Sequence, residues 1–78
     1  MTLSKRITTW REAKKMTRQH VAKRIGVSAA AVYQWEGTGE TTTKPSVGNL
    51  EKLVKAFGLT MEQFFGEVPE IEAERSAS

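Results

Sequence analysis

The sequence predicts an all-α protein that folds as one compact domain of five helices. Apolar residues recur three and four positions apart in successive segments, which is the spacing that gives a helix a single apolar face. Glycine, serine, threonine and proline lie between these segments, where they can end one helix and cap the next. The length of 78 residues is enough for one domain, which buries about 60% of its unfolded surface.

The first helix is expected from about Ser4 to Lys15. Leu3, Ile7 and Trp10 recur at i, i+4 and i+7, so they form one apolar stripe that can face a core. The other faces of this helix carry cationic residues, namely Lys5, Arg6, Lys14 and Lys15.

The stretch from Thr17 to Glu36 predicts two helices joined by a tight turn. Each helix has apolar residues on one face: Val21, Ala22 and Ile25 in the first, and Val32 and Trp35 in the second. Gly26 can adopt the left-handed conformation that ends a helix, and Ser28 can cap the next one through its hydroxyl. A turn this short makes the two helices cross steeply.

A polar loop from Gly37 to Pro45 precedes the fourth helix, which is expected from about Val47 to Phe57. Its spacing predicts a broad apolar face that closes the core and consists of Val47, Leu50, Leu53, Val54 and Phe57. Gly58 follows the last of these positions and is expected to stop the helix.

The fifth helix is predicted to be short. Thr60 can cap it, and Gln63 completes a Thr-x-x-Gln capping box. Phe64 and Phe65 are adjacent, so one short helix cannot bury both of them easily. One of the two is therefore expected at the surface, where it can contact another protein.

Charge is distributed unevenly along the chain. Residues 1–35 hold eight Lys and Arg residues against one Glu, a net charge of +7, whereas residues 36–78 hold four against eight, a net charge of −4. This asymmetry indicates that the basic segment, residues 1–35, faces a polyanion and that the acidic segment, residues 36–78, faces away from it. The alternative is that these charges only solvate helix faces.

The composition argues against an enzyme. The chain has no Cys, no Asp and one His, so it offers no catalytic triad, metal cluster or carboxylate pair at a plausible spacing, and no cofactor is expected. No apolar run approaches the roughly 18 residues of a membrane span. A soluble, cytoplasmic protein is expected, and the lack of cysteine fits a reducing compartment.

The order and spacing of these elements resemble the helix-turn-helix of the phage-repressor and Cro-like (XRE-type) DNA-binding family. Residues 17–22 are similar to the family's Ser-Gln-x-x-Leu-Ala start, residues 26–28 to its turn, and Trp35-Glu36 to the end of its recognition helix. Lys44-Pro45-Ser46 and the apolar positions from Leu50 to Phe64 look like its fourth and fifth helices. The resemblance implies a lambda-repressor-like domain over residues 1–66.

Residues 67–78 remain as an acidic tail, which is expected to be flexible. The alternative is an arm that swaps across a dimer, with Ile71 as its anchor.

The resemblance also implies roles for individual residues. It pairs Arg11 with Glu36, an ion pair that braces the first helix against the recognition helix. It places the DNA-contacting residues on both sides of the turn and in the loop after the recognition helix. Bases would be read by Ala29, Ala30, Tyr33 and Gln34, and phosphates would be held by Thr17, Arg18, Gln19, Ser28, Thr43 and Lys44.

Two explanations remain open for the alanines of the recognition helix. Their methyl groups can pack on thymine methyls while Gln34 bonds adenine. Alternatively, the helix docks closely and relies on phosphate contacts and DNA shape. The loop residues Thr43 and Lys44 have an alternative too, as part of a plain solvated loop.

Arg18 stands where the family commonly has a glutamine that contacts the DNA backbone and braces the first reading residue. Arginine has no hydrogen-bond acceptor, so it cannot brace in the same way. We therefore expect Arg18 to hold phosphate, and Arg18→Ala to weaken binding to every DNA sequence and to lower the salt slope.

The sequence thus predicts a transcriptional regulator of a phage or bacterial type that binds double-stranded DNA specifically. It is expected to act as a homodimeric repressor on a palindromic operator, reading bases with the helix over residues 28–35. The dimer candidates are Leu59, Met61 and Phe65. The alternative is an antitoxin or another protein-interaction module of the same fold, whose partner is a toxin or other protein and which may or may not regulate its own operon.

Overall fold

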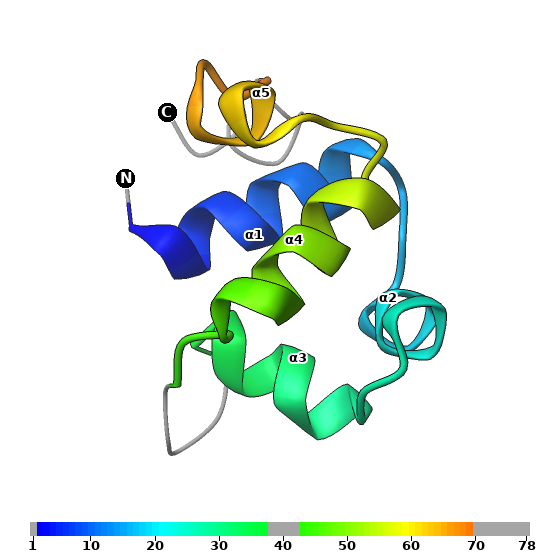
Figure 1. The fold of residues 1–78 in the computed structure, drawn as a ribbon. Helices are drawn as coiled ribbons and strands as arrows, with labels where there is room; N and C mark the ends of the chain where they lie inside the picture. Colours follow the sequence, from blue (N-terminus) through cyan, green and yellow to red (C-terminus); the bar gives the residue numbers. More distant parts are fainter. Residues whose placement is uncertain (1, 38–42, 70–78) are drawn as a thin grey trace.

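The computed structural model describes residues 2–37 and 43–69, and Figure 1 shows how their helices are arranged. The five helices are α1 (Leu3–Ala13), α2 (Arg18–Ile25), α3 (Ala29–Trp35), α4 (Val47–Ala56) and α5 (Met61–Phe65). No strand occurs in this part of the chain. The predicted all-α fold of five helices is confirmed.

Each helix begins at a serine or threonine that accepts a hydrogen bond from the backbone N–H three residues later. The donor–acceptor distances are 3.1 or 3.2 Å, and the capping residues are Thr2, Thr17, Ser28, Ser46 and Thr60. The capping box of Thr60 and Gln63 is present, with both of its bonds. These local bonds satisfy free N–H groups at the helix starts, which explains why the observed starts lie within one residue of the predicted ones.

Three of the described helices are followed by a glycine with positive φ. Gly26 (φ +82°) comes directly after α2, and Gly37 and Gly58 (each φ +74°) lie two residues after the last residue of α3 and of α4. A residue with a Cβ atom is strained in this left-handed region. Glycine at these positions therefore lets α2, α3 and α4 end without strain in the turn that follows each of them.

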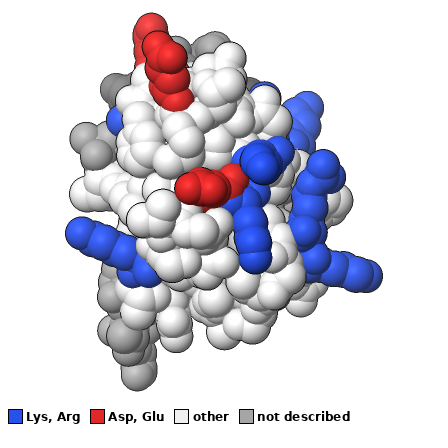
Figure 2. All heavy atoms as spheres, in the orientation of Figure 1, with Lys and Arg blue, Asp and Glu red and all other residues white. Residues whose placement is uncertain are grey.

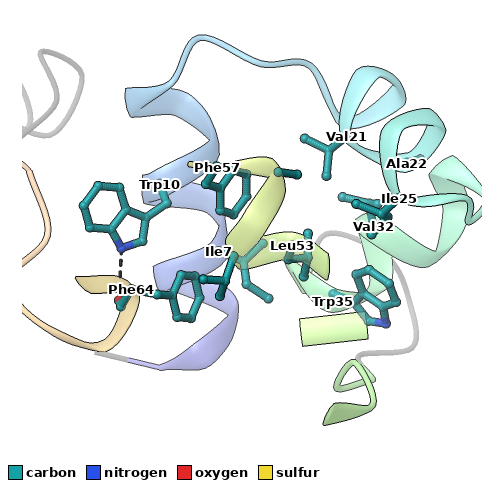
Figure 3. Packing of buried hydrophobic residues seen from close by; sticks show 12 residues of the cluster. Ile7, Trp10, Val21, Ala22, Ile25, Val32, Trp35, Leu53, Phe57 and Phe64 are labelled. Atoms are coloured by element: carbon teal, nitrogen blue, oxygen red, sulfur yellow. Dashed lines mark hydrogen bonds between the residues drawn. The ribbon is translucent and has the colours of Figure 1, made fainter. Parts of the chain in front are cut away.

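The core lies where α1, α4 and α5 meet at one end and α2 and α3 at the other (Figure 3). Leu53 of α4 lies between the two groups and is completely buried. Ile7 and Phe64 are completely buried on one side of it, and Val21 and Val32 on the other. Helix α4 thus joins the two halves of the domain.

The predicted apolar face of α4 is wrong at one position. Val47 is 73% exposed, and Ala56 is buried instead. Val47 is the first residue of α4, whereas the buried residues of this helix, Leu53, Val54 and Ala56, lie in its C-terminal half. Leu50, one turn later, is half-buried and packs against the core.

Arg6 is not one of the freely solvated cations on α1. Its Nη1 atom donates to the backbone carbonyls of Phe64, at 3.0 Å, and Gly66, at 2.7 Å. Trp10 donates its indole N–H to the same Phe64 carbonyl at 3.0 Å. Two side chains of α1 therefore hold the C-terminal end of α5, whose carbonyls have no partner within the helix.

The packed part of the chain extends past the boundary predicted at residue 66. Val68 is half-buried and packs against the core. The rest of the predicted tail, residues 70–78 with Ile71, lies outside the described residues. In the described ranges, no helix has the length and apolar character needed to cross a membrane.

Candidate nucleic-acid interface

The turn between α2 and α3 is held by backbone hydrogen bonds. The N–H groups of Gly26 and Val27 both donate to the carbonyl of Ala22, each at 2.9 Å. Val27 packs partly against the core, and Ser28 then caps α3. This arrangement places α3 across α2 at the surface of the domain (Figure 1).

Helix α3 divides its residues between the core and the surface. Val32 and Trp35 are buried, whereas Ala30 is exposed and Tyr33 is 43% exposed. Ala29 is half-buried and packs against the core, because it lies one turn before Val32 on the same face. Of the predicted base-reading residues, Ala30 and Tyr33 therefore face outward most clearly, and Ala29 does so only in part.

Glu36, at the end of α3, lies in a cluster of cations. Its carboxylate is fully enclosed and accepts from the Nε atom of Arg11 at 2.8 Å and from the Nη2 atom of Arg11 at 3.2 Å. Thr8 adds its hydroxyl at 3.0 Å. Arg11 also donates to the Met16 carbonyl at 2.8 Å, in the connection between α1 and α2. Arg11 and Glu36, which the family resemblance pairs, thus meet in a buried, bidentate contact.

Arg18 is the member of this cluster that sequence reasoning missed. Its Nε atom donates to Glu36 Oε1 at 2.9 Å, so one carboxylate binds two guanidinium groups. The Arg18 guanidinium also lies 4.6 Å from the centre of the Tyr33 ring. Arg18 braces the end of α3 by donating to Glu36, which is a different contact from the glutamine's brace of the first reading residue and needs no acceptor on Arg18.

Burial lowers the pKa of Arg18, but its hydrogen bonds and charge interactions with Glu36 and Tyr33 outweigh this and raise the pKa above its usual value. Arg18 therefore keeps its positive charge at neutral pH. The sequence did not indicate this contact: a carboxylate can accept about four hydrogen bonds, more than Arg11 alone supplies, but that capacity does not identify Arg18 as the second donor.

Comparison with protein families gives one decisive result. The model of the helix-turn-helix family HTH_3, of the XRE type with Cro- and C1-like members, matches residues 7–64. The chain belongs to this helix-turn-helix family. Its members are DNA-binding transcription regulators and are typically not enzymes. Comparisons with curated proteins and with solved structures give no significant match.

In this helix-turn-helix protein, the loop after α3 is tied to the recognition helix. The N–H of Thr43 donates to the carbonyl of Gln34 at 3.3 Å, and the Thr43 hydroxyl lies 3.5 Å from the Gln34 amide oxygen. Gln34 itself is half-buried. A predicted base-reading residue and a predicted phosphate residue are thus in direct contact, and the remaining loop residues, 38–42, lie outside the described part.

The predicted phosphate residues lie at helix starts and beside them. Thr17 and Ser28 use their hydroxyls as caps, and Gln19 and Lys44 are exposed. Figure 2 shows Lys and Arg side chains gathered over α2 and the C-terminal half of α4, and acidic side chains over α5 and the middle of α4. The surface of the helix-turn-helix is therefore basic on the side formed by α2. In the described residues, no group of three His, Cys, Asp or Glu could hold a metal ion.

The predicted dimer residues differ in exposure. Met61 is 38% and Phe65 50% exposed, whereas Leu59 is half-buried and packs against the core of its own chain. Phe65 stacks edge-to-face on Phe64, with ring centres 5.0 Å apart, and lies 5.8 Å from the Arg6 guanidinium. Helix α5 thus presents two apolar side chains on its outer surface.

Proposed function

We propose that the protein is a sequence-specific repressor that binds a palindromic operator as a homodimer and reads bases with α3. The observation that carries this proposal is the outer surface of α3, where Ala30 and the Tyr33 ring are exposed while Val32 and Trp35 anchor the helix in the core. A recognition helix needs short or polar side chains outside and a rigid support inside.

Base readout is assigned to three side chains of α3. The Ala30 methyl is exposed and can pack on a thymine methyl, and Tyr33 presents a ring edge and a hydroxyl. Gln34 can bond adenine through its amide, whose donor and acceptor match the adenine edge. Ala29 contributes less, because its methyl is directed partly to the core.

Phosphate contacts are assigned to the flanks of the recognition helix. Thr17, Arg18, Gln19 and the free N–H groups at the start of α2 form one flank, and Thr43 with Lys44 forms the other. Ser28 lies between them at the start of α3. Contacts of this kind make the affinity fall steeply as salt rises.

Selection of bound DNA from a random duplex pool at near-physiological salt tests the function directly. The expected product is an inverted repeat with half-site centres about 34 Å apart, which is one turn of DNA. Weak binding that vanishes as salt rises, without any enriched sequence, would contradict the proposal and favour an interaction module instead.

Gln34→Ala is expected to relax the preference at one base pair by about 1–3 kcal/mol and to leave the other positions of the operator unchanged. The reason is that alanine cannot distinguish adenine by hydrogen bonding. Competition binding against operators with single base-pair changes measures this preference.

Two matched variants separate this effect from others. Thr43→Val removes the hydroxyl that contacts the Gln34 side chain and leaves the Gln34 amide in place. Gln19→Ala removes a different glutamine, which is exposed on α2. Gln19→Ala is expected to lower the affinity for every DNA sequence equally. If Gln34→Ala does the same, Gln34 is not a base-reading residue.

Phe65→Glu is expected to convert the dimer to a monomer and to lower operator affinity at least tenfold. A carboxylate at this position would face its own symmetry mate in the buried centre of an isologous interface, at a high desolvation cost. Analytical ultracentrifugation gives the oligomeric state. Val47→Ser replaces an apolar side chain that is even more exposed, but away from α5, and should leave the dimer intact. A Phe65→Glu protein that sediments as a dimer would place the interface elsewhere.

A further inference from the structure

The side chain of Arg18 connects α2 to two places on α3. One is Glu36, at 2.9 Å, after the last turn of the helix, and the other is the face of the Tyr33 ring, at 4.6 Å. Tyr33 lies outside the buried core, so the place of the guanidinium over its ring is not part of the core packing of the described residues.

The anchor of this contact is rigid. Glu36 is fully enclosed and is also held by Arg11 and Thr8, both from α1. The Arg18 Nε–Glu36 bond therefore restricts the guanidinium plane before any ligand binds. A planar guanidinium stacks on an aromatic face, which a lysine ammonium cannot do in the same way.

The consequence concerns Tyr33. This side chain is 43% exposed, and an exposed ring ordinarily changes rotamer on a picosecond to nanosecond timescale. A guanidinium over one face of the ring restricts the orientations that the ring can adopt at the surface of α3. The conformational entropy of the Tyr33 side chain is then already reduced in the free protein, so less is lost when the ring contacts a base. The contact with the correct base pair is strengthened, and with it the preference for that base pair over others.

We propose that Arg18 is a positioning residue for base readout, which sets the orientation of Tyr33 through a contact anchored on Glu36. The inference rests on the proposed function, in which Tyr33 faces base edges. It differs from a phosphate role for Arg18 in its consequences: loss of a phosphate contact weakens binding to all sequences alike, whereas loss of positioning weakens discrimination at the base pair that Tyr33 reads.

The variant that separates these roles is Arg18→Lys, because it keeps the charge and removes the planar group. Tyr33→Ala first identifies the base pair that Tyr33 reads, and a second operator is made with that base pair changed. Competition binding to the selected operator and to the changed operator is then measured for Arg18→Lys, Tyr33→Ala and the double variant. Arg18→Lys should lose roughly 3- to 30-fold in preference between the two duplexes, with an unchanged salt slope. In the Tyr33→Ala background the same substitution should change the preference less than twofold.

Thr8→Val controls for a merely structural effect. It removes another hydrogen bond to Glu36 without touching Tyr33, so it should lower the melting temperature and leave the preference intact. Melts of all variants ensure that binding is compared between folded proteins.

Three results would overturn the inference. They are an Arg18→Lys protein with wild-type preference, one that loses affinity equally for both duplexes, and an effect that persists without Tyr33. A wild-type protein that selects no sequence would instead contradict the proposed function itself, and the inference with it.

Discussion

Glu36→Ala is expected to lower the free energy of unfolding by about 3–5 kcal/mol. The substitution leaves two guanidinium groups, Arg11 and Arg18, without the carboxylate that both contact, and Arg11 is buried. A domain of this size has only about 4–12 kcal/mol of stability. Urea unfolding followed by circular dichroism measures the loss, and the variant should be largely unfolded at temperatures where the wild type is folded.

Glu51→Ala is the matched control, because Glu51 is exposed on α4. Its effect should lie within about 0.5 kcal/mol of zero. Glu36→Gln keeps the shape and one acceptor, so it should fall between the two. A Glu36→Ala protein that melts with the wild type would mean that the cluster contributes nothing to stability, and the role assigned to this carboxylate would be wrong.

The cluster also shows what the sequence could and could not predict. The contact of Arg11 with Glu36 follows from the resemblance to a family in which the same pair occurs. The contact of Arg18 does not, because it replaces the family's glutamine and its partner depends on how α2 lies against the end of α3. Spacing along the chain contains no information on that distance.

Helix bounds were predicted well because their signals are local. A hydroxyl three residues before a backbone N–H, or a glycine after an apolar stripe, is visible in the sequence and acts within one turn. The starts at Thr17, Ser28 and Thr60 are of this kind. Periodicity likewise identified Ile7, Leu53 and Val32 as core residues.

The sequence does not predict features that depend on how far the packing between helices extends. Periodicity assigned Val47 to the buried face of α4, but it does not say where along the helix the packing ends. Periodicity also does not show that the methyl of Ala29, a predicted base-reading residue, packs partly against the core. The sequence places Arg6 among the cations outside the apolar stripe of the first helix, but it does not show that Arg6 binds the carbonyls of Phe64 and Gly66, which are 58 and 60 residues away along the chain.

Phe64→Ala is expected to cost about 3–5 kcal/mol, because Phe64 is completely buried and its loss leaves a cavity beside Ile7. Helix α5 has only five residues and cannot be stable by itself, so this side chain holds it to α1. The bonds from Trp10 and Arg6 to the Phe64 carbonyl would weaken as the helix undocks. Thermal and urea unfolding measure the effect.

The adjacent Phe65→Ala provides the control, since it removes the same number of atoms from a ring that is half exposed on the same short helix. Its cost should stay near 1 kcal/mol, chiefly from the lost edge-to-face contact with Phe64. Equal losses for the two variants would mean that α5 is held by its outer face as well. Because Phe65 is also the proposed dimer contact, the comparison is made at protein concentrations where each variant is monomeric, so that unfolding and dissociation are not confused.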